Sequence, residues 1–352
     1  MCKKFRLTGG NITDNLHFFT DKSFCCGKYE EFDNVRLYNI VGCDLAEKGS
    51  ILQIISEILK ETPQIIYYSP YEPQLPQAVY LPELNTLAAS GYNICCTERL
   101  NSRTYDISSI ISPEAAAVEE ITGYTIEQSD AYRNKSLELI GIADLLLREY
   151  IKNGAELLKS DRVRLYAKKK ISSILTAKAS EGENKYRSVS AITCNGYRFT
   201  ELPEDYQIIR LCDNYIAASS LFVRAAAREA NCLGYDTVIS RAADSESSPL
   251  HLIIPEAKTA FISESEIFSS RFSESRRLNL ERFYVSGLMT SREHDISVFG
   301  GYVRKIYNEA ILCARLCTDI KAQGRKLLMP FVSRKKAFEI ASEIIEAILN
   351  RV

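Results

Sequence analysis

The first half of the chain alternates short apolar runs with helical spacing. Between the first two runs, residues 50–60 carry apolar side chains three and four positions apart, which predicts a helix that stops before Pro63. Helical spacing then fills about residues 125–180. The apolar runs predict strands at residues 35–41, 64–68 and 77–81, and after Glu83.

The second half repeats this order. A helix over residues 220–234 ends at Gly234, and helical spacing returns at about residues 291–324 and 334–350. Alternation of strand and helix predicts an α/β fold with parallel sheets and right-handed crossovers. The predicted strands are residues 207–211, 237–240, 250–254 and 258–262.

An internal repeat relates the two halves. Residues 77–90 read QAVYLPELNTLAAS and residues 250–263 read LHLIIPEAKTAFIS, with Pro-Glu pairs 173 residues apart. Residues 131–154 match residues 301–324 at a spacing of 170. A consistent register of this kind predicts a duplicated domain with one strand order used twice.

The repeat divides the chain into two tandem halves, each followed by long helices. We expect a first half of residues 1–180, with its loop at residues 42–50, and a second half of residues 181–352, with its loop at residues 212–220. The polar stretch AKASEGENKYR, residues 177–187, is the predicted boundary.

Composition places the chain among soluble globular proteins. Of its 352 residues, 46% are apolar and 25% are charged, and the net charge of −1 gives no basic field for nucleic acid. No signal-type segment is seen, and no run approaches the roughly 20 apolar residues of a membrane helix. We expect a cytoplasmic protein that binds neither nucleic acid nor a membrane.

Cysteine and histidine usage does not predict a metal centre. The eleven cysteines include two adjacent pairs, whereas zinc sites favour a spacing of two to four residues. Reduced, buried cysteines are the simpler interpretation. The three histidines, His17, His251 and His294, suggest no nucleophile–base pair.

The stretch VGCDLAEKGS approaches the phosphate-binding loop G-x-x-x-x-G-K-[ST]. In such a loop, glycines let backbone N–H groups face one phosphate, the lysine reaches the outer phosphates, and the hydroxyl binds Mg²⁺. Gly42 and Lys48 stand at the first glycine and the lysine, but Glu47 replaces the second glycine. Gly49 takes the hydroxyl position and Ser50 comes one residue late. The first half therefore has a candidate nucleotide site that is impaired for catalysis.

The second loop departs further from the motif. Cys212 and Ala217 replace the glycines, and Ala218 replaces the lysine. Ser219 and Ser220 keep hydroxyls at a helix start, where Ser219 serves most simply as an N-cap. We expect this loop not to bind a nucleoside triphosphate.

Acidic residues occur at comparable places in both halves. Glu83 and Glu256 follow apolar strands, where a P-loop fold places a carboxylate that orders Mg²⁺ or water; a structural turn is the alternative. Asp44 and Asp213 lie within the loops. They would repel phosphate, but could cap the following helix in place of a lost ligand.

These residues resemble a family of uncharacterised bacterial ATPases with two tandem P-loop NTPase-like halves. The family loop reads G-x-P-G-T-G-K-S-T, and a segment ending in I-I-P-E-L follows a Tyr-His-Cys and Asp-Pro stretch. Here Tyr67-Tyr68-Ser69 and Glu72-Pro73 stand in those places, and SAITCNGY is similar to the family's S-A-I-T-P-x-G strand. The resemblance covers nearly the whole chain and implies ATP and Mg²⁺ at the first half only.

Three functions are compatible with these patterns. We favour a degenerate tandem P-loop NTPase-like protein with a binding or regulatory role, in which nucleotide binding at Lys48 is weak and hydrolysis is weak or absent. Neither loop combines a Mg²⁺-binding hydroxyl with a glycine-lined nest. The alternatives are an active ATPase or kinase-type enzyme that uses Lys48, and a scaffold that binds a protein partner through the long helices.

Overall fold

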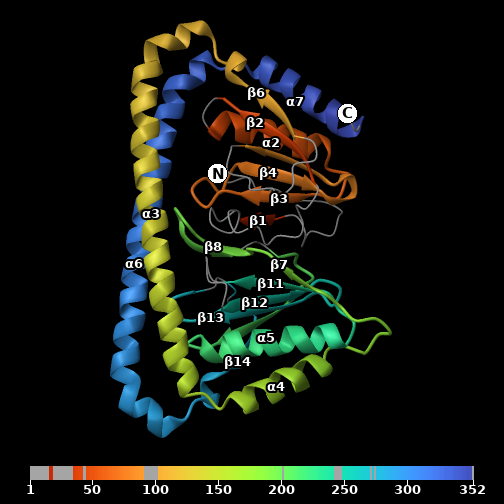
Figure 1. The fold of residues 1–352 in the computed structure, drawn as a ribbon, viewed down its shortest axis with the longest axis vertical. Coiled ribbons are helices and arrows are strands. Elements are labelled where there is room, and N and C mark those ends of the chain that lie inside the picture. Colours follow the sequence, from red (N-terminus) through yellow and green to blue (C-terminus); the bar gives the residue numbers. More distant parts are fainter. Residues whose placement is uncertain are drawn as a thin grey trace. The chain divides into compact units, whose positions relative to one another are not determined.

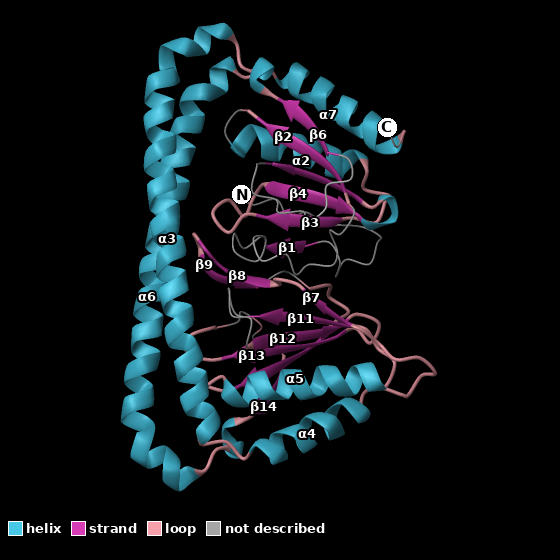
Figure 2. Cartoon of the chain, in the orientation of Figure 1, coloured by secondary structure: helices cyan, strands magenta, loops and turns pink. Residues whose placement is uncertain are grey.

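The computed structural model describes residues 16–18, 35–42, 45–90, 102–199, 202–241, 248–269, 272 and 275–350. The chain folds into two compact units: unit 1 comprises Met1–Asn134 and Cys313–Val352, and unit 2 comprises Lys135–Leu312. Each unit is mixed α/β, with a six-stranded sheet and segments of two long helices (Figure 1, Figure 2).

Unit 1 is built on a sheet of strand order β1-β3-β4-β5-β2-β6. Its inner helix α2 (Leu45–Ile58) and its outer helix α7 (Arg334–Leu349) share one apolar core with one face of this sheet. The strands are β1 (Leu16–Phe18), β2 (Arg36–Val41), β3 (Ile65–Tyr68), β4 (Pro76–Leu81), β5 (Thr86–Ser90) and β6 (Ser102–Asp106).

Unit 2 has a sheet of order β14-β10-β13-β12-β11-β7 and a separate hairpin, β8-β9. Its inner helix α5 (Ala217–Cys232) and outer helix α4 (Ser160–Ser172) pack into its core. The strands are β7 (Asn184–Tyr186), β8 (Ser190–Thr193), β9 (Gly196–Phe199), β10 (Gln207–Cys212), β11 (Thr237–Arg241), β12 (Pro249–Ile254), β13 (Thr259–Glu264) and β14 (Arg276–Asn279).

The two sheets have the same strand order, as the internal repeat predicts. Written in reverse, the strand order of unit 2 is β7-β11-β12-β13-β10-β14. It corresponds strand for strand to the order of unit 1, β1-β3-β4-β5-β2-β6. Both Pro-Glu segments connect the third and fourth strands of that series. Each turn ends on a left-handed residue, Asn85 and Lys258, both with φ of 46°.

The expectation of parallel sheets is wrong at one strand in each unit. β4 and β12 run antiparallel to both neighbours, while the remaining pairs are parallel. The reason is the length of the Pro-Glu connection: four residues join β4 to β5, and four join β12 to β13. A connection this short closes a hairpin, whereas a parallel return needs a crossover of about a dozen residues.

Two long helices each contribute to both units. α3 (Ala116–Glu156) begins in unit 1 and ends in unit 2, and α6 (Ser286–Leu328) begins in unit 2 and ends in unit 1. Within unit 2, the Ser136 hydroxyl of α3 donates to the Ala310 carbonyl of α6 at 2.9 Å. The units are therefore not the two sequence halves, because α7 from the second half packs in unit 1 and α4 from the first half packs in unit 2.

The polar stretch at residues 177–187 belongs to unit 2 and contains β7, which pairs in parallel with β11. The Lys178 N–H donates to the Leu233 carbonyl at 3.0 Å, and the Gly182 N–H donates to the Asn231 carbonyl at 2.9 Å. A Cβ on Gly182 would collide with the backbone of Tyr235. Glycine therefore lets this stretch lie directly against the turn between α5 and β11.

In unit 1, the loop after β3 is joined to α6. The buried Glu72 carboxylate forms an ion pair with Arg325, and the Thr318 hydroxyl donates to the Tyr71 carbonyl. Breaking a buried pair of this kind leaves an uncompensated charge, so the contact favours one position of the helix against the loop.

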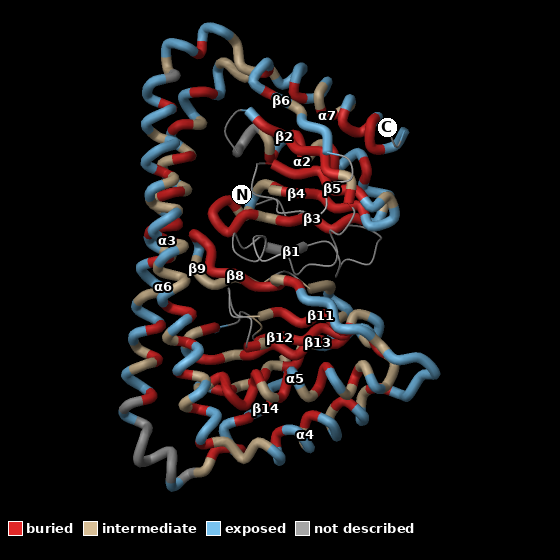
Figure 3. Tube along the Cα trace, viewed as in Figure 1, coloured by how far each residue is buried: buried red, intermediate tan, exposed pale blue. Residues whose placement is uncertain are grey.

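Burial follows the layers of each unit. Figure 3 shows buried residues along the central strands, whereas the peripheral strands β6 and β7 are largely exposed. Within the described ranges, no helix is apolar over a stretch long enough to span a membrane.

Candidate functional site

The junction between β10 and α5 in unit 2 has the length of a phosphate-binding loop. Four residues separate Cys212 from Ala217, the same number that separates the two glycines of G-x-x-x-x-G-K. Ile216 completes the turn with φ of 64° and is 1% exposed. Left-handed backbone at a β-branched residue costs on the order of 1 to 3 kcal/mol, so the surrounding contacts must enforce it.

The Asp213 carboxylate occupies the interior of this turn. Its Oδ2 accepts from the Ser219 N–H at 2.7 Å, and its Oδ1 accepts from the Tyr215 N–H at 3.1 Å. Oδ1 also accepts from the Tyr284 hydroxyl at 2.9 Å. Asp213 is 2% exposed, so these contacts are made in the core of unit 2.

The Asp213 carboxylate therefore accepts hydrogen bonds from backbone N–H groups that a loop of this shape would donate to a bound anion. Backbone N–H groups at a helix N-terminus favour a negative charge, and here the charge belongs to the chain itself. Burial raises the pKa of Asp213, while the hydrogen bonds to its carboxylate act in the opposite direction. The prediction that Asp213 caps the helix directly is confirmed.

Tyrosines surround this carboxylate. The Tyr284 hydroxyl, which donates to Asp213, accepts from the Ala218 N–H at 3.1 Å. The Tyr150 hydroxyl donates to the Asn214 carbonyl at 2.8 Å. Burial beside Asp213 raises the pKa of Tyr284 and of Tyr150, so both remain protonated donors.

The predicted N-cap role of Ser219 is wrong. Ser219 and Ser220 are the third and fourth residues of α5 and are buried. The Ser219 hydroxyl donates to the Ile216 carbonyl at 3.0 Å, and its N–H is satisfied by Asp213. The helix begins two residues before Ser219, so the serine hydroxyl bonds back into the turn.

The junction in unit 1 is shorter. Three residues separate β2 from Leu45, the first residue of α2, against four between β10 and α5, so Lys48 is already the fourth residue of the helix. Lys48 is half-buried and Ser50 is exposed on α2. In a phosphate-binding loop the lysine stands at the start of the helix, and the residues before it form the loop around the phosphate. Here the helix already begins at Leu45, so the residues directly before Lys48 are helical and do not form such a loop. Asp44 and the side chain of Glu47 lie outside the described residues.

Gly42 is required by its backbone and by its neighbours. Its φ is +102°, and a Cβ there would lie 2.5 Å from Asp106 Oδ1 and 2.9 Å from Ser108 Oγ. Asp106 accepts from the Ser108 N–H at 2.8 Å, and bonds from Ser108 lower the pKa of this carboxyl. The strand end of unit 1 therefore also carries a carboxylate, contributed by β6.

Gly49 does not stand in for a Mg²⁺-binding residue, because it faces the sheet. A Cβ at this position would lie 2.8 Å from Leu75 Cβ and 3.3 Å from the Pro76 carbonyl oxygen. Real Cβ atoms do not approach so closely, so a serine here would push α2 away from the start of β4. A hydroxyl at position 49 is thus excluded by packing.

Replacing Gly49 with serine should lower the free energy of unfolding by about 1 to 3 kcal/mol, the usual cost of overpacking a core. Gly123 is the matched control, since it is also helical and a Cβ there would meet nothing within 4 Å. The Gly123→Ser variant should be as stable as the parent or slightly more stable. Urea unfolding of both variants measures the difference, and equal midpoints would contradict the packing role of Gly49.

Glu83 and Glu256 lie at the opposite end of the strands from the two loops. Arg36, the first residue of β2, is opposite Thr86, so the turn that carries Glu83 is beside the start of β2 while Gly42 follows its end. Glu256 is placed in the same way relative to β10, whose start is opposite Thr259. Neither glutamate can reach a ligand at its loop; the structural-turn alternative is the one observed.

Strand pairing also changes the alignment of the two loops. The first residues of β2 and β10 are opposite Thr86 and Thr259, which are themselves equivalent in the repeat. In this register Gly42 corresponds to Asp213, not to Cys212. The same sheet position therefore carries no side chain in unit 1 and a buried carboxylate in unit 2.

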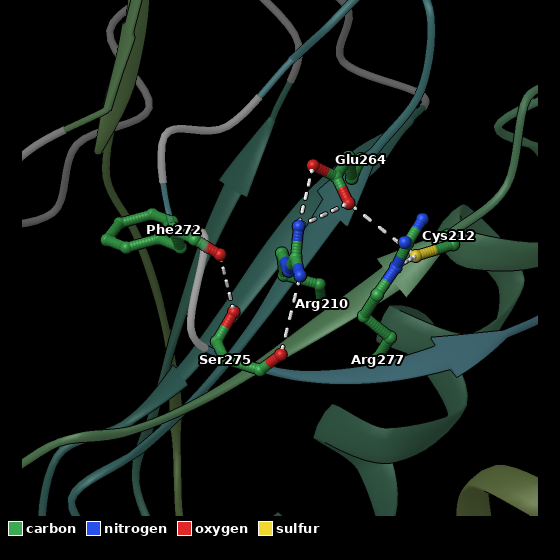
Figure 4. A network of polar contacts seen from close by, with 6 residues as sticks. All are labelled: Arg210, Cys212, Glu264, Phe272, Ser275 and Arg277. Atoms are coloured by element: carbon green, nitrogen blue, oxygen red, sulfur yellow. Dashed lines mark hydrogen bonds and ion pairs between the residues drawn. The ribbon is translucent and has the colours of Figure 1, made fainter.

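A polar network at the end of β10 was not predicted (Figure 4). Arg210 donates to both carboxylate oxygens of Glu264, at 3.2 and 3.3 Å, and to the Ser275 carbonyl at 3.4 Å. The Arg277 Nε–H donates to Cys212 Sγ at 3.3 Å, and that sulfur lies 3.5 Å from Glu264. These contacts tie β13 and β14 to β10 beside the Asp213 turn.

The sequence contained a weak signal for this network. Arg210 and Glu264 are the only charged residues of their strands, β10 (QIIRLC) and β13 (TAFISE). Opposite charges on neighbouring strands attract when they lie opposite or diagonal to one another. The two residues are 54 positions apart in the sequence, and neither strand alone indicates that the two strands are neighbours.

Other residues on which the family resemblance rests lie in β3 and in the loop that follows it. Tyr67 and Tyr68 belong to β3, and Glu72 forms its ion pair with Arg325 in the loop beyond. In the described part of the chain, no three potential metal ligands gather at one point. Comparison with known protein families, with curated proteins and with solved structures finds no match for this chain.

Proposed function

We propose that this protein is a non-catalytic binding or regulatory protein, built from a duplicated unit of P-loop NTPase-like descent. The observation that carries the proposal is the Asp213 carboxylate, which is bonded by two backbone N–H groups and a tyrosine hydroxyl inside the turn. A phosphate in the same place would meet a buried negative charge and no lysine.

The first unit supports the same proposal for a different reason. α2 begins at Leu45, so no full loop precedes Lys48, and Gly49 is packed against Leu75, so no Mg²⁺-binding hydroxyl follows it. Asp106 adds an exposed carboxylate beside Gly42. ATP and Mg²⁺ at Lys48 would have to bind without the nest that makes such sites tight.

A protein partner is part of this proposal. α3 exposes Ile142 and Leu145, one helical turn apart within unit 2, with 48% and 61% of their surfaces accessible. Side chains three positions apart lie on one face of a helix, so this pair offers a small apolar surface to a protein partner.

Calorimetric titration of ATP with Mg²⁺ into the intact protein should give no measurable binding. ATP hydrolysis should equal the protein-free background, and Lys48→Ala should change neither result. An alanine at position 48 leaves the described core intact, since Lys48 is only half-buried. Turnover that Lys48→Ala abolishes would establish the phosphoryl-transfer alternative and refute this proposal.

A further inference from the structure

We infer that the two sequence halves are binding partners of each other: each supplies the outer helix of the other half's sheet, so that this single chain is a fused pair of helix-exchanged subunits. The first half is residues 1–180 and the second is residues 181–352, as the repeat defines them. The partner recognised by each half is therefore a copy of its own fold.

In unit 1, α7 from the second half covers α2 from the first half (Figure 1). The Tyr38 hydroxyl of β2 donates to the Ala347 carbonyl of α7 at 2.9 Å, across 309 residues of sequence. Ile51, Leu52 and Ile55 of α2 are 0% exposed in the resulting core. The side chains of α7 buried in this core are Ala337, Ala341, Ile344, Ile345, Ala347 and Ile348.

In unit 2 the origins of the helices are reversed. α4 comes from the first half and packs on α5 of the second half. The Tyr166 ring lies 6.1 Å from the Phe222 ring, and Lys168 of α4 is 3.7 Å from Glu229 of α5. The side chains of α4 buried in this core are Val163, Ala167 and Ile171.

A backbone bridge before each outer helix shows that the exchange is reciprocal. In unit 1, the Ser112 N–H donates to the Phe331 carbonyl at 2.9 Å, and the Ser333 N–H donates to the Ile110 carbonyl at 2.8 Å. Both bonds join the first half to the second. The segment at residues 331–333 leads directly into α7.

Unit 2 has the same bridge with the halves interchanged. The Val285 N–H donates to the Leu157 carbonyl at 2.9 Å, and the Lys159 N–H donates to the Phe283 carbonyl at 2.9 Å. Val285 follows Ser112 by 173 residues, and Ser333 follows Lys159 by 174, so donors and acceptors correspond through the repeat. An exchanged pair of equivalent subunits produces two such bridges, one for each direction of exchange.

The exchange predicts a crossed pattern in hydrogen–deuterium exchange of the intact chain. Ile344→Ala on α7 should speed exchange most in residues 36–58, which belong to the other half. Val163→Ala on α4 should speed exchange most in residues 207–232, again in the other half. We expect about tenfold or more in each case, because local opening follows the loss of buried contacts.

Each variant has a control on its own helix. Phe338 on α7 and Leu165 on α4 are both 54% exposed, so Phe338→Ala and Leu165→Ala should leave the exchange rates unchanged. If Ile344→Ala speeds residues 207–232 as much as residues 36–58, or more, the inference is wrong. It is equally wrong if Val163→Ala speeds residues 36–58 as much as residues 207–232, or more.

Cleaving the intact protein between its halves gives a second test. Ala179 and Ser180 are both exposed, so a protease site inserted between them can be cut in the folded protein. The two fragments should elute together at the full-length volume and separate only in denaturant. Two separately eluting, folded fragments would overturn the inference, since each unit contains elements from both fragments.

Discussion

Replacing Asp213 with alanine should lower the free energy of unfolding by about 3 to 5 kcal/mol, because three donors lose a buried, charged acceptor together. These donors are the N–H groups of Tyr215 and Ser219 and the hydroxyl of Tyr284. Asp213 is 2% exposed, so bulk water does not replace the carboxylate without local opening. Guanidinium unfolding followed by circular dichroism measures the loss.

Asp205 provides a matched control for Asp213. Its exposed carboxylate pairs with the exposed Lys258 at 2.6 Å, so Asp205→Ala should leave the midpoint nearly unchanged. Asp213→Asn should fall between parent and alanine, since the amide keeps one acceptor but turns an N–H₂ group toward N–H donors. If Asp205→Ala and Asp213→Ala lower the free energy of unfolding equally, the buried hydrogen bonds of Asp213 do not stabilise the protein more than an exposed ion pair does.

Sulfate distinguishes a retained anion site from a purely structural turn. In Asp213→Ala, local opening of the turn should let the freed N–H groups at the start of α5 bind a small anion, as helix N-termini do. Sulfate should therefore raise the melting temperature of Asp213→Ala more than that of the parent, which gains only the general stabilisation by a kosmotropic salt. Equal gains would remove the main support for descent from a phosphate-binding loop.

The central strands were predictable because strands buried in the core consist largely of apolar residues. β2, β3 and β12 are nearly continuous apolar runs, which is typical of strands buried on both faces, whereas β10 alternates buried and more exposed positions. β6 and β14 were missed, since their sequences SRTYD and RRLN lack an apolar pattern. Strands at a sheet edge have little apolar surface to bury, so periodicity does not reveal them.

The partners of the outer helices could not be predicted. The apolar spacing of α4 and α7 shows that each buries one face, but an amphipathic helix carries no record of which sheet it covers. That choice depends on the length and direction of α3 and α6, which carry the chain from one unit to the other. The boundary expected at residues 177–187 failed for a local reason, because Gly182 permits close backbone contact.

The candidate site was predictable only where a local rule governed it. Asp213 caps the helix that directly follows it, a relation that loop position and the helix dipole were enough to suggest. Glu83 was misplaced because the direction of β5 depends on the four-residue hairpin before it. Gly49 was misread because its role depends on Leu75, which no loop motif contains.

His251 should make the stability of unit 2 depend on pH. The ring is 0% exposed on β12, and burial lowers its pKa to about 3. The Ser263 N–H donates to Nδ1 at 3.2 Å, so the neutral ring carries its proton on Nε2 and donates to the Tyr197 hydroxyl at 2.7 Å. A proton added to Nδ1 would face an N–H donor in the core.

Lowering the pH from 7 to 4.5 should therefore remove about 2.5 kcal/mol of stability through His251 alone. The unfolded chain takes up this proton near its ordinary pKa of about 6.5, whereas the folded protein resists it until a pKa of about 3. The contribution is full above pH 6.5 and is lost as the pH falls.

His251→Asn keeps an acceptor toward Ser263 but does not titrate, so its unfolding midpoint should fall less over this range. The exposed His294 is the control, and His294→Asn should retain the parental pH dependence. If the His251→Asn variant follows the parent at every pH, the buried ring does not resist protonation as its contacts require.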